Sequence, residues 1–207
     1  MNNVYEVVPL SELLDNYDEA NITKVLNNFK TVDVDKDVED FLRHKAISFQ
    51  KADTSRTYLV FLKINRKTEL VGYFSIISKP LVIRGPEWNK LSGKTRKSLV
   101  GRINYQKINE NDHRDITGIL LGQLGKDVRF KDDVKGADLL SLAEQTAKNA
   151  WRAVGGRLLW LEADNNEKLT QFYELNEYTR VVNNESEVLL NQNGQNFFIK
   201  LLSNLEI

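Results

Sequence analysis

Two apolar runs separated by one long amphipathic segment constrain the fold of this chain most. Ile116 to Leu124 is almost unbroken in apolar residues, and a second apolar run extends from Arg157 to Ala163. Strands that are buried on both faces have this composition. The segment between them, from about Ala137 to Val154, reads as a helix and ends at Gly155-Gly156, as expected of a C-terminal cap. This order predicts a right-handed crossover between two neighbouring parallel strands.

The N-terminal half shows a different pattern, in which two strands are joined by a short turn. Thr57–Ile64 and Leu70–Ile77 are rich in strand-forming residues, with a polar turn at Arg66–Glu69, so we expect a hairpin. A mixed central sheet flanked by helices follows, which is an α+β (α/β) fold. The remaining expected elements are a first strand at Val4–Leu10, helices at Ser11–Leu14, Asn21–Phe29, Val38–Phe49, Ser92–Val100 and Glu167–Leu175, and a last strand at Phe197–Leu202.

Composition excludes several classes of protein. The 207 residues have a formal net charge of zero and no cysteine, which rules out disulfides and thiolate chemistry and fits a reducing, cytoplasmic compartment. No run approaches the ~18 apolar residues of a membrane span. The N-terminus lacks a signal-peptide pattern. With two histidines we expect no metal site. We expect one domain over residues 1–207, with a basic insertion at about 79–115.

Basic side chains gather in this insertion, between residues 79 and 107, where Glu87 is the only acid. Two interpretations stay open: a solvated basic face, or a surface that faces a polyanion such as RNA. The basic residues are Lys79, Arg84, Lys90, Lys94, Arg96, Lys97, Arg102 and Lys107.

The segment from Leu124 to Leu140 resembles the acyl-CoA segment of the GNAT superfamily of N-acyltransferases. That segment has an aromatic residue, Gln or Arg, two variable residues, Gly, one variable residue, and Gly or Ala. Phe130 and Lys131 occupy the first two places, Val134 stands at the first glycine and Gly136 at the second. The resemblance implies that the backbone of the preceding strand pairs with the pantetheine arm and that the loop holds the pyrophosphate at a helix N-terminus. The implied acetyl-CoA residues are Leu124, Lys126, Lys131, Asp132, Val134, Lys135, Gly136 and Ala137.

Two features of this loop depart from the family pattern. Valine disfavours the positive φ that glycine adopts, and Asp132 with Asp133 adds negative charge beside an anion site, which Lys131 and Lys135 offset. We therefore expect Val134→Gly to strengthen binding of the anion. The alternative is an ordinary strand-to-helix connection.

A second segment matches the family at constant spacing. Asn166, Leu169, Phe172, Tyr173, Glu174 and Tyr178 follow the pattern Asn-x-x-Ala-x-x-Phe-Tyr-Glu-x-x-Gly-Phe, with Glu177 at the glycine. The resemblance implies that Asn166 lies in the cofactor site and that the Tyr173 hydroxyl is the general acid that protonates the departing thiolate. We expect Phe172 in the core and Tyr173 at its edge. The alternative is that both aromatic residues are core residues of an amphipathic helix.

A third set of segments is similar to the toxin-type acetyltransferases of bacterial toxin–antitoxin pairs: Asp37–Leu42, Ser55–Val60 and Leu70–Ser75. This likeness implies N-acetyl transfer from acetyl-CoA to a primary amine, the α-amine of an aminoacyl-tRNA. Two other functions stay open: a non-catalytic GNAT-fold binding protein, and a nucleic-acid or protein-binding module that uses residues 79–107. The sequence also leaves open whether an antitoxin protein or a second copy of the chain is bound.

Overall fold

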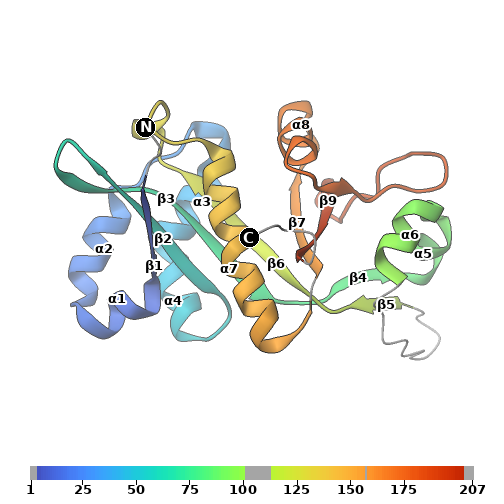
Figure 1. Ribbon diagram of the computed structural model, residues 1–207, viewed down its shortest axis with the longest axis horizontal. Helices are drawn as coiled ribbons and strands as arrows, with labels where there is room; N and C mark the ends of the chain where they lie inside the picture. Colours follow the sequence, from blue (N-terminus) through green and yellow to red (C-terminus); the bar gives the residue numbers. More distant parts are fainter. Residues whose placement is uncertain (1–3, 101–112, 157, 203–207) are drawn as a thin grey trace. The chain divides into compact units, whose positions relative to one another are not determined.

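The computed structural model describes residues 4–100, 113–156 and 158–202 (Figure 1). The chain forms two units. The first contains residues up to Ile77 together with Leu121–Thr146, and the second contains Ser78–Leu120 together with the residues from Ala147 onward. Within the described residues, no helix is both long and apolar enough to cross a membrane.

Three antiparallel strands begin the first unit: β1 (Tyr5–Pro9), β2 (Arg56–Ile64) and β3 (Lys67–Ser78). The predicted β2–β3 hairpin is confirmed, with Thr57 opposite Ser75. Its turn is shorter than expected, because Ile64 pairs directly with Lys67. Asn65 and Arg66, at φ 49 and 68, form the two-residue turn whose left-handed backbone matches the twist of the strands.

Helices cover this sheet with an apolar layer. They are α1 (Leu10–Asn16), α2 (Glu19–Asn27), the short η1 (Asp33–Asp35), and the continuous run of α3 (Lys36–Asp40), η2 (Phe41–Lys45) and α4 (Ala46–Lys51). The predicted helix at Val38–Phe49 is confirmed within that run, but η2 has π-helical hydrogen bonds. The buried residues of this layer are Leu10, Ile22, Leu26, Phe29, Phe41, Leu42, Ala46, Leu59, Leu70 and Tyr73.

The predicted strand–helix–strand crossover is also present. It consists of β6 (Gly118–Lys126), a 3-10 turn η3 (Val128–Phe130), α7 (Gly136–Val154) and β7 (Leu158–Asp164). β6 and β7 are parallel, and their ladder extends from the pair Gly118–Leu158 to the pair Leu120–Trp160. Beyond that ladder β6 continues to Lys126, in the first unit.

The C-terminal strands complete a mixed sheet. β9 (Gln195–Leu201) pairs antiparallel with β7 on one side and with β8 (Thr179–Arg180) on the other. The strand order of the seven-stranded sheet is β1-β2-β3-β6-β7-β9-β8, which confirms an α+β fold with a mixed sheet. Helix α8 (Glu167–Leu175) follows β7.

The basic segment contains more structure than the sequence indicates. The helix expected at Ser92–Val100 is present as α6 (Gly93–Val100). Strands β4 (Leu81–Arg84) and β5 (His113–Ile116) were not predicted; they form a two-stranded sheet on which α5 (Gly85–Lys90) packs (Figure 1). Four-residue strands next to Pro80 and Pro86 give too short a pattern to recognise.

Candidate functional site

The loop between β6 and α7 starts at a buried carboxylate. Asp127 has no exposed surface, and its side chain accepts hydrogen bonds from Arg129 N (2.9 Å), Nε (2.9 Å) and Nη2 (2.7 Å) and from Lys30 N (3.2 Å). A buried charge is costly unless it is fully paired in this way. The backbone is fixed at the same point, because Asp127 N donates to Val71 O and Val128 N donates to Lys30 O. Sequence reasoning missed Asp127, since an acidic residue near an anion site suggested repulsion rather than support.

Lys126 and Val134 stabilise the loop from inside. The Lys126 ammonium donates to the carbonyl oxygens of Val134 at 3.2 Å and Lys131 at 3.4 Å. Val134 is 1% exposed, and its N–H donates to Phe130 O at 3.0 Å. Its φ is not positive. The expectation that this position requires a left-handed backbone is therefore wrong: the chain turns through η3, and the valine side chain fills the core.

Helix α7 begins with free donors. Within the described part of the chain, the backbone N–H groups of Lys135, Gly136 and Ala137 donate to no other residue. Unpaired N–H groups and the dipole of a 19-residue helix favour an anion at this end. The side chains of Lys131 and Lys135 are exposed beside them, as are those of Asp132 and Asp133. The arrangement can hold a phosphate group through the backbone, with charges of both signs around it.

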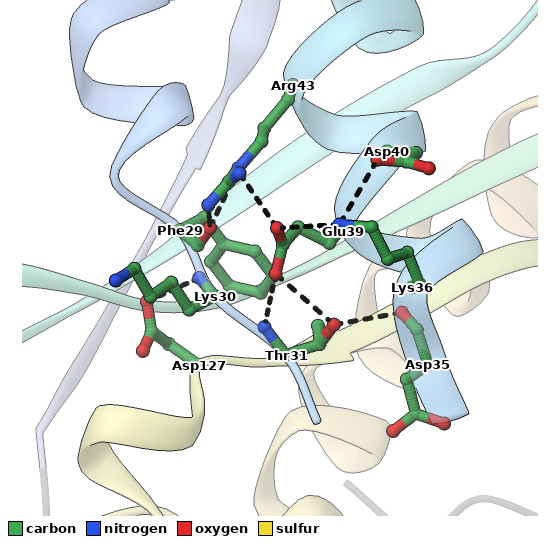
Figure 2. Close-up of polar contacts among 9 residues, drawn as sticks. All are labelled: Phe29, Lys30, Thr31, Asp35, Lys36, Glu39, Asp40, Arg43 and Asp127. Atoms are coloured by element: carbon green, nitrogen blue, oxygen red, sulfur yellow. Dashed lines mark hydrogen bonds and ion pairs between the residues drawn. The ribbon is translucent and has the colours of Figure 1, made fainter. Parts of the chain in front are cut away.

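A polar cluster lies on the other side of Asp127 (Figure 2). Glu39 accepts from Thr31 N at 2.8 Å and pairs with Arg43 Nη1 at 2.8 Å and with Lys36 Nζ at 3.7 Å. The Thr31 N–H, with help from Arg43 and Lys36, holds the pKa of the Glu39 carboxyl below its ordinary value, although burial acts in the opposite direction. The sequence shows Glu39 only as part of a helix motif, and nothing in its spacing indicates burial.

Beneath the end of β6 lies a buried tyrosine. The Tyr73 hydroxyl donates to Val38 O at 2.5 Å and to Gln123 Oε1 at 3.4 Å. Burial, and to a smaller extent the charge of Asp37, raises the pKa of Tyr73 well above its ordinary value. The Tyr73 phenol therefore stays protonated at neutral pH and does not serve as a general base.

The second unit contains the other two predicted residues, on α8. Asn166 is the N-cap: its Oδ1 accepts from Leu169 N at 2.9 Å, and its side chain is exposed. Tyr173 is buried, 8% exposed, with its ring centroid 5.6 Å from that of Tyr178 and 5.1 Å from that of Phe198. Phe172 is only half-buried. The expected placement, with Phe172 in the core and Tyr173 at its edge, is therefore wrong, because contacts with β9 turn the tyrosine inward.

The end of α8 explains the glycine of the family pattern. Glu177 N donates to Glu174 O at 3.0 Å and Tyr178 N donates to Tyr173 O at 3.0 Å, the two bonds of a Schellman motif. The residue between helix and return must be left-handed, and Glu177 has φ 66. Spacing therefore reflects backbone geometry here, even where the glycine itself is replaced.

The basic segment presents its charges on β4, α5 and α6 and just before them. Lys79, Arg84, Lys90, Lys94 and Lys97 are exposed and Arg96 is half-buried, while Arg102 and Lys107 lie outside the described residues.

Comparison with protein-family models gives no match, and no curated protein sequence matches the chain. Solved structures do. The toxin AtaT complexed with acetyl-methionyl-tRNAfMet superposes with a TM-score of 0.65 at 20% identity, over 97% of this chain and 96% of that one. A tyrosine-to-phenylalanine mutant of KacT gives 0.66 at 18% identity, over 98% and 96%. A similar mutant of AtaT, bound to the C-terminus of the antitoxin AtaR and acetyl-CoA, gives 0.62 at 16%, over 96% and 94%. These proteins have the GNAT fold, and this chain has the same fold.

Proposed function

We propose that this protein is an N-acetyltransferase that moves the acetyl group of acetyl-CoA to a primary amine, the α-amine of an aminoacyl-tRNA. The observation that carries the proposal is the likeness to AtaT along nearly the whole of both chains, in a structure that contains acetyl-methionyl-tRNAfMet. Further structures of AtaT contain acetyl-CoA. The free N–H groups at the start of α7 support the same cofactor, because a pyrophosphate docks on such groups.

Each predicted cofactor residue has a role in this proposal. The backbone of Leu124 and Lys126 pairs with the pantetheine arm as one strand pairs with another. The loop from Lys131 to Ala137 holds the pyrophosphate, with Lys135, Gly136 and Ala137 donating through their N–H groups. Val134 and the Lys126 side chain maintain the shape of the loop. Asn166 acts through the cap that starts α8.

The chemistry requires one proton donor near the thioester sulfur. The amine nitrogen attacks the thioester carbonyl carbon, the tetrahedral intermediate expels the thiolate by breaking its C–S bond, and the Tyr173 hydroxyl gives its proton to that sulfur. The proton that the amine loses returns through solvent to the tyrosine. A phenol with a pKa near ~10 holds its proton at neutral pH until the thiolate forms.

An α-amine suits a site without a carboxylate base. Its pKa is near ~8, so a fair fraction is neutral at physiological pH, whereas a lysine side chain is almost wholly charged. The basic segment offers a surface for the tRNA phosphates. We place this reaction in the cytoplasm, in a chain that acts as one domain, and include an antitoxin protein as a partner because AtaT and KacT are solved with theirs.

Saturating acetyl-CoA tests the cofactor claim. A ligand at 100 times its dissociation constant stabilises the fold by ~2.7 kcal/mol, which is roughly 5–10 °C in melting temperature for a chain of this size. A shift of this size, together with acetyl transfer to an aminoacyl-tRNA, supports the proposal. The absence of any shift at millimolar acetyl-CoA would refute it.

A non-catalytic GNAT-fold binding protein is the second candidate. The observation in its favour is the pair of exposed carboxylates, Asp132 and Asp133, in the loop that should hold an anion. Under this alternative, the protein binds CoA weakly or not at all and transfers no acetyl group. Asp132→Asn with Asp133→Asn then leaves CoA affinity unchanged, whereas the acetyltransferase should bind more tightly without these charges.

A further inference from the structure

The segment between α2 and η1 is fixed through its backbone at three consecutive residues. Phe29 O accepts from Arg43 Nε at 2.9 Å and also from Arg43 Nη2. Thr31 N donates to Glu39 Oε2 at 2.8 Å. Between them, Lys30 N donates to Asp127 Oδ2 at 3.2 Å, and Lys30 O accepts from Val128 N at 2.8 Å. Residues 29–31 therefore connect the helix of Glu39 to the first residues of the β6–α7 loop (Figure 2).

The two charged residues of this connection are committed to it. The Glu39 and Arg43 side chains are 11% and 20% exposed, and they bind each other at 2.8 Å. Every group of Arg43 that forms a hydrogen bond in the structure serves either Glu39 or Phe29 O. Arg43 lies within the π-helical turn η2, a type of turn that is frequent at functional sites. Neither residue takes part in the reaction proposed above.

We propose that Glu39 and Arg43 are positioning residues for the acyl-CoA loop: they fix residues 29–31, which in turn hold Asp127 and Val128 in the place where the pyrophosphate loop begins. This inference rests on the proposed function, because it concerns how the same loop binds acetyl-CoA. Two-sided anchoring matters because the α7 N–H groups bind phosphate only when the preceding turn directs them outward together.

Positioning and simple electrostatics predict opposite signs for the same substitution. Glu39→Gln removes a negative charge, and since CoA is an anion, the Coulomb effect alone leaves affinity unchanged or improves it. If Glu39 positions the loop, Glu39→Gln must instead weaken binding. A matched control exists in the same unit: Glu19, exposed at the start of α2, pairs with Lys51 at 2.5 Å, and Glu19→Gln makes the same change of charge.

The experiment is calorimetric titration of acetyl-CoA into the full chain and its variants Glu39→Gln, Arg43→Lys and Glu19→Gln. We expect the dissociation constant to rise roughly tenfold for Glu39→Gln, which is ~1.4 kcal/mol, and to stay within about twofold for Glu19→Gln. Arg43→Lys keeps the charge and loses the forked contact with Phe29 O, so it should weaken binding in the same direction. In the acetyl-transfer assay, KM for acetyl-CoA should rise while kcat at saturating acetyl-CoA stays nearly constant, and amide exchange at Lys30 and Val128 should accelerate.

Each outcome is decisive. If the parent chain binds acetyl-CoA and Glu39→Gln binds it equally well or better, the positioning role is refuted while the proposed function stands. If the parent chain gives neither heat nor a thermal shift with acetyl-CoA, the proposed function fails and this inference fails with it. If Glu39→Gln shows no cooperative melting transition, Arg43→Lys decides the question, and unchanged affinity in that variant overturns the proposal.

Discussion

Gly125, on β6 directly before the loop, is a position where one methyl group should be costly. A Cβ on Gly125 would lie 2.6 Å from Tyr73 Cε1 and 2.7 Å from Val38 Cγ1. Carbon atoms pack best at about 3.5–4.0 Å, so the neighbours would have to retreat by about 1 Å. Tyr73 cannot do so easily, because it has no exposed surface, its hydroxyl binds Val38 O, and its ring packs edge-on against Phe29 at 5.3 Å.

Overpacking of this kind typically costs 1–3 kcal/mol, and the fixed ring places Gly125→Ala in the upper half, at about 2–3 kcal/mol. For a chain of this length that is a fall of roughly 4–12 °C in melting temperature, measured by circular dichroism or calorimetry. Gly93, the first residue of α6, is the matched control: a Cβ there meets nothing within 4 Å, so Gly93→Ala should leave the melting temperature unchanged or raise it. An unchanged melting temperature for Gly125→Ala would refute the packing of β6 on Tyr73.

Three further predictions concern the cap of α8, the buried carboxylate and the basic segment. Glu177→Gly should raise the melting temperature by a few degrees, because a left-handed backbone costs an L-residue about 1–2 kcal/mol and the lost contact with Lys200 is a weak, exposed pair at 3.8 Å; a fall would refute the cap geometry. The lowered pKa of Glu39, which Lys36 and Arg43 face, contributes stability that is complete above the ordinary value of about 4.3 and is lost as the pH falls through the folded-state pKa; Glu39→Gln should flatten this acid limb in melting curves, and an unchanged limb would contradict the assignment. Binding of bulk tRNA should weaken steeply with salt, and glutamate at positions 94, 96 and 97 should flatten the slope, whereas salt-independent binding would leave the segment as a solvated face.

The sequence predicted those parts of the fold that have long periodic patterns. The runs at Ile116–Leu124 and Arg157–Ala163 are apolar because β6 and β7 lie inside the sheet, and the helix between them is long enough for its period to be unambiguous. The hairpin was equally clear, but its turn was placed too late, since Asn65 and Arg66 carry no glycine to mark a left-handed pair. Strands β4 and β5 are too short for an alternation to stand out.

The candidate site shows where local patterns stop being informative. Val134 stands at a glycine position of the family pattern, yet its burial is decided by a turn that only the folded loop displays. Phe172 and Tyr173 are adjacent on one helix, and periodicity could not say which of them faces β9; the rings of Tyr178 and Phe198 select the tyrosine. Glu39 and Asp127 are buried because their partners come from distant segments, which no local spacing records.

Acetyl transfer to an aminoacyl-tRNA, followed by mass spectrometry of the released aminoacyl group, tests the central claim most directly when the parent chain is compared with Tyr173→Phe. That substitution removes one hydroxyl and retains the ring that packs on Tyr178 and Phe198, so stability and acetyl-CoA affinity should change little. A general acid contributes typically ~10²–10⁴-fold, so we predict an acetylated α-amine with the parent chain and turnover lower by about that factor with Tyr173→Phe. Transfer at the parent rate by Tyr173→Phe would remove the tyrosine from the mechanism. A parent chain that binds acetyl-CoA but acetylates no aminoacyl-tRNA, peptide amine or small amine would contradict the account.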